Sequence, residues 1–265
     1  MNIFLKEVKS HRKSLIFWCI GVFLMVVSGM SKYEAYSSSG QSMNDLLKDM
    51  PKSLAAVLGF NDLDVSKPSG YYGLLFLYLL LMATIHAAML GATIIAKEER
   101  DKTSEFLFVK PVSRNMIITA KLLAAFVNIV TFNLVTYGSS VVLMGQYAKG
   151  GDITSDIGMT MAGMFFLQVL FMVLGSAIAA VKKRPKSAAS LASAVLLLTY
   201  VLSVAIDLSP NIEGLKYLTP FKYFEAKNVM YGGGLDAVFV VISIGLTAAF
   251  SIITYVCYQK RDLAV

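Results

Sequence analysis

The sequence predicts an all-α integral membrane protein. Of its 265 residues, 56% are hydrophobic and only 15% are charged, whereas about a quarter of the residues of a soluble domain are charged. The mean hydropathy is +0.65. A soluble core of this size cannot bury so much apolar surface, so lipid must be the solvent for part of the chain.

A transmembrane helix needs about 20 mostly apolar residues, and six stretches meet this condition. The first follows four basic residues, as the apolar part of a signal peptide does. The only small residues at its C-terminal end are Ser28-Gly29, and it has no clear Ala-x-Ala cleavage site. We therefore expect this span to be retained in the protein. The six expected spans form one transmembrane domain and cover residues 14–30, 71–96, 122–145, 157–181, 188–208 and 235–258.

The basic residues predict the topology. Sixteen of the 24 Lys and Arg residues lie before the first span, in the second-to-third and fourth-to-fifth loops, and after the sixth span. Because basic residues collect on the cytoplasmic side, we expect both termini in the cytoplasm and the protein in a bacterial inner (plasma) membrane. The same rule explains the net charge of +7, which therefore does not indicate a nucleic-acid partner.

Two segments outside the spans have helical patterns of their own. In Met1–Lys13, apolar residues alternate with basic ones, which suits an N-terminal amphipathic helix lying on anionic lipid. The expected external loop, residues 31–70, contains apolar residues at roughly helical spacing from Leu46 to Leu58. Pro51 interrupts this pattern and Gly59 ends it, so we expect a short interfacial helix there.

The expected cytoplasmic loop between spans two and three, residues 97–121, contains four consecutive apolar residues, Phe106–Val109. Its charged opening is typical of a solvated helix end. Asp101 or Thr103 can cap a short helix, which Pro111 would end. An apolar run in such a loop is either a docking surface or a segment lying among lipid headgroups. The residues alone favour neither interpretation.

This loop resembles the signature of the ATP-binding cassette (ABC) type-2 permeases. The matching positions are Thr103, Glu105, Leu107, Pro111, Val112, Ser113, Arg114 and the pair Ala120-Lys121. The chain departs from the pattern at Lys102, where the family has glycine, and at Phe108, where leucine is common. The segments Leu46–Phe60, Leu215–Ala226 and Tyr258–Leu263 also resemble the corresponding parts of that family, so the resemblance covers essentially the whole chain.

The resemblance implies a six-span permease subunit of an exporter. Such a subunit pairs with a second permease subunit, as a homodimer or heterodimer, and each binds a cytoplasmic ABC ATPase that holds ATP and Mg²⁺. The helix after span two would be the coupling helix that docks on this ATPase. The residues expected to couple to it are Glu98, Glu99, Thr103, Glu105, Phe106, Leu107, Phe108, Pro111 and Arg114.

The chain itself is expected to be neither an enzyme nor a metal protein. Its sequence contains no G-x-x-x-x-G-K-[ST] motif to cradle phosphates and no Cys/His cluster with the spacing of a metal site. An intramembrane protease, which requires a nucleophile paired with a base, is not expected either, because Ser139 and Ser140 lack the required serine motif and His86 would be their only possible base. The nearly charge-free spans weakly favour an amphipathic or apolar substrate, such as a peptide, an antibiotic or a lipid.

Four polar residues within the spans are candidates for lining a translocation path, namely His86, Asn128, Asn133 and Tyr137. His86 is the only ionisable residue deep in a span, and such residues are functional candidates. A neutral histidine bonded to a neighbouring helix is the simpler role, and polar residues also join helices in lipid. Asp207, at the outer end of span five, is expected to be solvated.

The alternative function is an ATP-independent secondary transporter coupled to protons or ions. Proteins of that class usually show internal repeats or broken spans with several buried charges. The six spans show neither feature clearly, so the ABC permease interpretation is preferred.

Overall fold

The computed structural model describes residues 3–38, 50–60, 63–101, 112–146, 154–182 and 187–260, and within these ranges every regular element is a helix. Six of the helices are long and apolar enough to cross a membrane. They are α1 (Ile3–Ser38), α4 (Pro68–Arg100), α6 (Arg114–Gly145), α7 (Thr154–Val181), α8 (Ala188–Leu208) and α10 (Ala237–Gln259). The predicted all-α, six-span fold is therefore confirmed.

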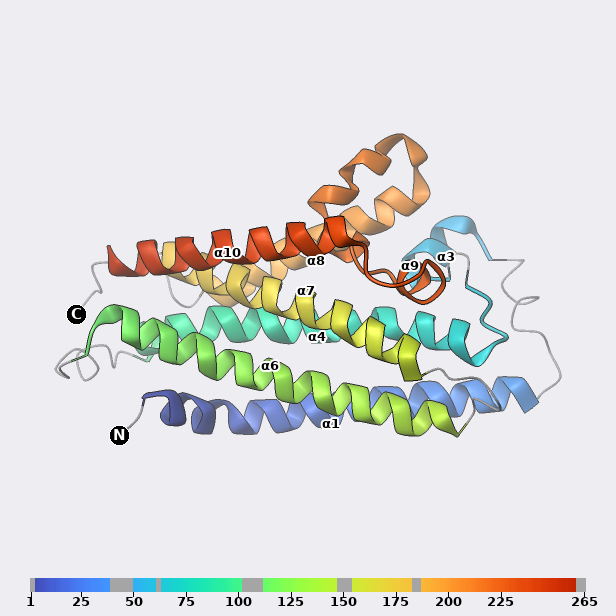
Figure 1. Ribbon diagram of the computed structural model, residues 1–265, viewed down its shortest axis with the longest axis horizontal. Helices are drawn as coiled ribbons and strands as arrows, with labels where there is room; N and C mark the ends of the chain where they lie inside the picture. Colours follow the sequence, from blue (N-terminus) through green and yellow to red (C-terminus); the bar gives the residue numbers. More distant parts are fainter. Residues whose placement is uncertain are drawn as a thin grey trace.

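The six long helices lie side by side in a bundle (Figure 1). The described ends of the chain lie at one end of this bundle, together with the last turn of α4 and the first turn of α6 (Figure 1). We call this the termini end. The short elements α3 (Lys52–Leu58), η2 (Pro210–Leu218), η3 (Pro220–Lys222) and α9 (Ala226–Tyr231) lie toward the opposite end, which we call the far end.

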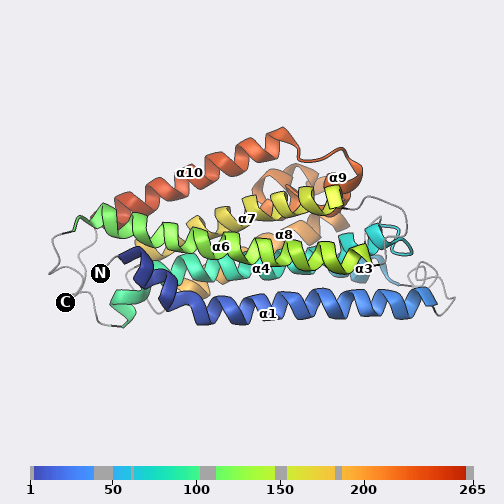
Figure 2. The same ribbon diagram turned by 60° about the horizontal axis from the view of Figure 1, so that its bottom comes forward.

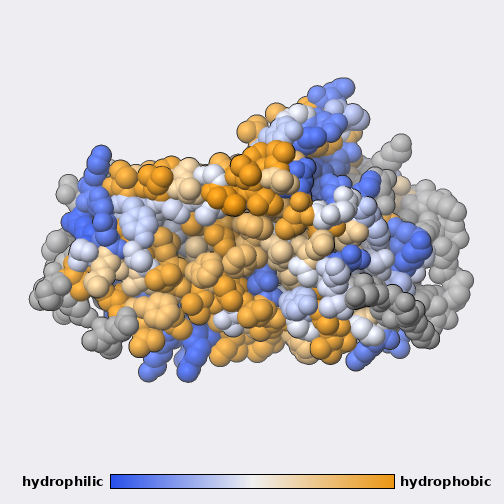
Figure 3. All heavy atoms as spheres, in the orientation of Figure 1, coloured by the Kyte–Doolittle hydropathy of each residue, from blue (hydrophilic) through white to orange (hydrophobic). Residues whose placement is uncertain are grey.

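The surface has the pattern expected of a membrane protein. On the face shown in Figure 3, hydrophobic residues cover the middle of the bundle, and hydrophilic residues gather toward its two ends. An apolar belt between polar ends matches the hydrocarbon core and headgroup regions of a bilayer.

Helices α4 and α7 form the centre of the bundle. In each, 67% of the most apolar window is buried, against 11% in α10. Glycine permits their close approach: a Cβ on Gly91 would lie 1.9 Å from the carbonyl oxygen of Met172, and one on Gly175 would lie 2.2 Å from that of Ala88. The hydroxyl of Ser176 also donates to the carbonyl oxygen of Gly91 at 3.2 Å. Small residues at such contacts let helix backbones pack closely in lipid.

Helix α1 differs from the expectation at its start. Residues 3–13 are the first turns of one continuous helix that ends at Ser38, rather than a separate amphipathic helix. Figure 2 shows these first turns inclined to the rest of α1. Their position in the headgroup region stays a prediction.

The short helix predicted in the loop at residues 31–70 is present but shorter than its apolar pattern. Pro51 precedes α3 as its N-cap, and Gly59 ends it with a φ of 79°. Glycine adopts this left-handed conformation without the steric cost that a side chain would bring. The apolar residues before Pro51 lie outside the described residues, except Met50.

Candidate functional site

The candidate coupling residues fall into two groups. Thr103, Glu105, Phe106, Leu107, Phe108 and Pro111 lie outside the described residues. Glu98, Glu99 and Arg114 are described and flank this segment, at the C-terminal end of α4 and the N-terminal end of α6. The geometry of the site therefore rests on how these two helix ends are held.

A buried ion pair joins the two helix ends. The ammonium of Lys121 in α6 donates to the carboxylate of Glu98 in α4 and, at 2.6 Å, to the carbonyl oxygen of Ile94. The side chain of Lys121 is 0% exposed and that of Glu98 is 10% exposed. A charge at such a depth is tolerated only when it is paired and hydrogen-bonded, so this pair fixes α6 against α4 beside the loop.

A second ion pair adds α1 to this arrangement. The ammonium of Lys97 lies 3.1 Å from the carboxylate of Glu7 and donates to the hydroxyl of Ser10 at 2.7 Å. Glu7 is 1% exposed, and His11 lies 3.8 Å from the same carboxylate oxygen. We call Glu7, Lys97, Glu98 and Lys121 the loop-flanking ion network, because it connects α1 to the end of α4 and the start of α6, the two described helix ends that flank the loop in the sequence.

The start of α6 is fixed by local contacts. The Ser113 hydroxyl accepts a hydrogen bond from the Met116 amide at 3.2 Å, which satisfies one of the amides at the helix start. The guanidinium of Arg114 donates to the carbonyl oxygen of Gln259 at 2.8 Å. Arg114 therefore connects the beginning of α6 to the end of α10. At the other flank, the hydrogen bond from Arg100 lowers the pKa of the Asp101 carboxyl.

The four candidate path residues make different kinds of contact. The ring of His86 lies between Trp18 of α1 and Phe132 of α6, with centroid separations of 5.3 and 5.1 Å. Asn128 donates to the carbonyl oxygen of Ala124 within its own helix, at 2.7 Å. His86 therefore packs against two neighbouring helices, whereas Asn128 is bonded within α6 and is 2% exposed.

The remaining two path candidates also contact their own bundle. Asn133 donates to the carbonyl oxygen of Met161 at 3.2 Å and to the side-chain oxygen of Gln168 at 3.0 Å, so it joins α6 to α7. Tyr137 is partly buried against the hydrophobic core. A path-lining role for any of the four stays a prediction.

Sequence reasoning missed the roles of Lys97, Lys121 and Glu7. Lys97 was interpreted only as a basic residue of a cytoplasmic loop, and Lys121 as such a residue and as a match to the permease signature, although Lys121 is fully buried. The available signal was that mostly apolar residues stand on both sides of Lys121, at 116–120 and 122–127, where a solvated lysine is not expected. Among the described residues, no group of three or more His, Cys, Asp or Glu residues is arranged to hold a metal ion.

Comparison with known proteins gives the family. No curated protein matches the chain. The sequence model of the ABC-2 family transporter proteins, however, matches residues 1–263. That match covers the six apolar helices and the loop that resembles the type-2 permease signature. Proteins of this kind are multi-pass membrane components of ABC transporters and work with an ABC ATPase subunit. The chain belongs to the ABC-2 family of transporter proteins.

Proposed function

We propose that this chain is the membrane-spanning subunit of an ATP-driven exporter. Two permease subunits would pair to form the translocation path, and each would bind a separate ATPase through the loop at residues 102–111. ATP hydrolysis, with its Mg²⁺, would take place in the partner chain. The termini end would face the cytoplasm of a bacterial cell, and the far end would face outward.

The observation that carries this proposal is the loop-flanking ion network. A loop that transmits force must be joined to the spans on both sides, and here Glu98 and Lys121 join its two flanks to each other. Lys97 and Glu7 extend the connection to α1. Because separating a buried ion pair leaves an uncompensated charge, a displacement of the loop should move three helices together.

The exposed apolar helices support a dimer in lipid. In α8 and α10 only 22% and 11% of the most apolar window is buried within the subunit. Large apolar residues such as Leu198, Val201 and Val241 are exposed on these helices. Lipid and a second permease subunit are the two surfaces that can cover them in a membrane. The apolar spans fit an amphipathic or apolar substrate, such as a peptide, an antibiotic or a lipid.

The test is co-purification in mild detergent from the native host, followed by ATP-driven transport in vesicles. We expect a stoichiometric ATPase to accompany the chain. The double change Phe106→Asp and Phe108→Asp should remove the ATPase, because a docking surface cannot bury two carboxylates without partners. The matched control is Leu215→Asp with Leu218→Asp, which adds the same charges on exposed residues of η2.

Two results would contradict the proposal. If ATP-driven transport survives the phenylalanine double change, the coupling assignment is wrong. If the purified chain transports without any ATPase, it is an ATP-independent secondary transporter. One observation favours testing His86 in that event: this residue is 3% exposed, and its Nδ1 atom has no hydrogen-bond partner within the described residues.

A further inference from the structure

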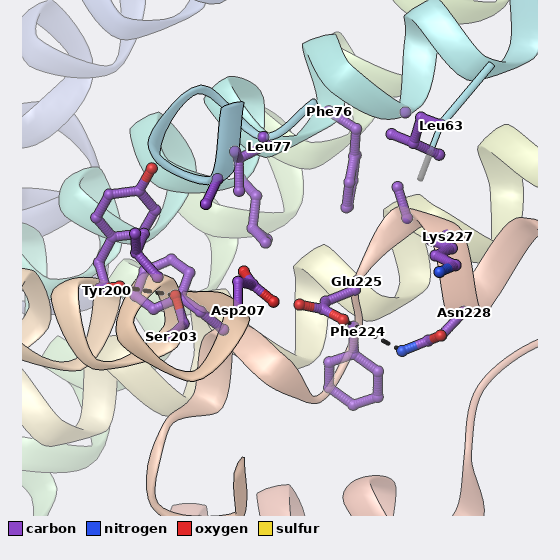
Figure 4. A pocket seen from close by; sticks show the side chains of 17 residues that line it. Leu63, Phe76, Leu77, Tyr200, Ser203, Asp207, Phe224, Glu225, Lys227 and Asn228 are labelled. Carbon is purple, nitrogen blue, oxygen red and sulfur yellow. Dashed lines mark hydrogen bonds between the residues drawn. The ribbon is translucent and has the colours of Figure 1, made fainter. Parts of the chain in front are cut away.

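A cavity of about 190 Å³ lies at the far end of the bundle, apart from the coupling loop. Residues of α3 and α4 line one side, and residues of α8, η3 and α9 line the other (Figure 4). Four aromatic rings border it, those of Phe76, Tyr200, Phe221 and Phe224. Tyr200 and Phe221 pack edge to face, with centroids 5.4 Å apart. The cavity thus has an aromatic and aliphatic wall.

Two carboxylates form the polar side of the cavity. Figure 4 shows the side chains of Asp207 and Glu225 pointing toward each other across its floor. The ammonium of Lys222 pairs with both. Asp207, expected to be solvated at the end of its span, is instead half of an ion pair with a side chain that is 29% exposed.

Asp207 has fewer polar partners than Glu225. Glu225 also accepts a hydrogen bond from the Asn228 amide at 3.3 Å, and Lys227 lines the cavity beyond it. In Figure 4 both Lys227 and Asn228 lie on the side of Glu225 away from Asp207. Within the described residues, the Asp207 side chain makes no hydrogen bond other than the one from Lys222. One ammonium therefore serves two acids, and Asp207 retains acceptor capacity toward the cavity.

We propose that this cavity binds an organic ammonium ion with a short apolar stem. Carboxylate oxygens accept hydrogen bonds from an ammonium group, and the faces of aromatic rings attract it. The aliphatic wall formed by Leu77, Leu80 and Val204 suits the stem. The cavity, at about 190 Å³, has room for a short stem and its ammonium head.

This inference deepens the proposed export function. It rests on that function only in so far as the bound ammonium belongs to a transported molecule. The same chemistry occurs in a free amine and in the headgroup of an aminophospholipid. In either case the ligand would be held at the far end of the bundle, where a molecule leaving an exporter would be released.

The experiment measures binding of hexylammonium to the purified chain in an uncharged maltoside detergent, by ligand-observed NMR with protein-free micelles subtracted. Hexylammonium should saturate, whereas hexanol and heptanoate, with the same hexyl stem, should bind at least about tenfold more weakly. Asp207→Asn should weaken hexylammonium by about tenfold, since the charge-assisted hydrogen bond is lost. Its matched control is Glu213→Gln, an exposed acid of η2 that does not line the cavity.

A second variant keeps the proposal testable if Asp207→Asn fails to fold. Val204→Phe fills the cavity and leaves every charge in place, and it should abolish saturable binding. Equal affinities for hexylammonium and hexanol would overturn the proposal, as would equal weakening by Asp207→Asn and Glu213→Gln, or unchanged binding in Val204→Phe.

The source of the ammonium follows from competition. A short-chain phosphatidylethanolamine that displaces hexylammonium identifies a lipid headgroup, whereas absence of displacement identifies a free amine. Hexylammonium binding is measured on the chain without an ATPase, so a failure to bind hexylammonium would not affect the co-purification result. Loss of co-purification would in turn leave ammonium binding intact, so the two proposals fail separately.

Discussion

The two ends of the bundle use buried charge in different ways. At the termini end each acid has its own base: Lys121 and Glu98 are 0% and 10% exposed, with a carbonyl oxygen as the third partner. At the far end one lysine serves two acids, and Asp207 and Glu225 are 29% and 33% exposed. The first arrangement is almost wholly buried and suits a rigid joint. The second borders a cavity and keeps acceptor capacity, as a binding site requires.

The largest expected effect comes from breaking the joint. Lys121→Met leaves the Glu98 carboxylate buried without its base, which should cost about 3–5 kcal/mol of unfolding free energy. Chemical unfolding in detergent, followed by circular dichroism, measures this loss. The double change Lys121→Met with Glu98→Leu removes both charges and should recover most of it. A double variant no more stable than the single one would show that the loss has another cause.

The next effect concerns the helix that connects the two ends, because α4 carries both Glu98 and the cavity residue Phe76. Gly91→Ala places a methyl group where 1.9 Å is available, so α4 and α7 must separate, at a cost of about 1–3 kcal/mol. The matched control is Gly138→Ala in α6, whose Cβ would contact nothing. This control should be neutral or slightly stabilising, because alanine favours helix. Equal losses in both variants would refute the close-packing argument.

Breaking the far-end cluster should cost less than breaking the joint. Lys222→Met removes the shared ammonium, but the two carboxylates are about a third exposed and gain water in its place. We expect a loss of about 1–2 kcal/mol by the same unfolding measurement. A loss as large as that of Lys121→Met would remove the proposed contrast between the two ends.

The pH dependence of this variant sharpens the comparison. Burial raises the pKa of Glu225 above its ordinary 4.5, and Lys222 opposes the rise. Without Lys222, the folded-state pKa of Glu225 should rise further above the unfolded value. A raised folded-state pKa contributes stability that is fully present below the unfolded-state pKa of about 4.5. This stability is lost as the pH increases through the folded-state pKa. The stability deficit of Lys222→Met relative to wild type should therefore shrink between neutral pH and about pH 5.

The sequence predicts the six spans because twenty-residue apolar stretches have few alternatives, and motif resemblance predicts which loop couples to an ATPase. It did not predict which charges meet. Glu7 and Lys97 are 90 residues apart in the chain, and the Asp207–Lys222 pair depends on the path of η2 and η3. Such contacts follow from how helices pack, which hydropathy does not encode. Lys121 was the exception, since the mostly apolar residues on both sides of it were a visible signal.

The smallest expected effect separates both clusters from ordinary surface charge. Glu213 and Lys216 in η2 pair at 3.1 Å, but their side chains are 67% and 36% exposed. Although the Glu213 hydrogen bond raises the pKa of Lys216, water and salt screen such a pair. Glu213→Gln should therefore leave the unfolding midpoint unchanged within error, at low and at high salt. A salt-dependent shift of the unfolding midpoint as large as that of Lys222→Met would mean that exposure does not distinguish the two far-end ion pairs. The contrast between the joint and the binding site would then rest on the cavity alone.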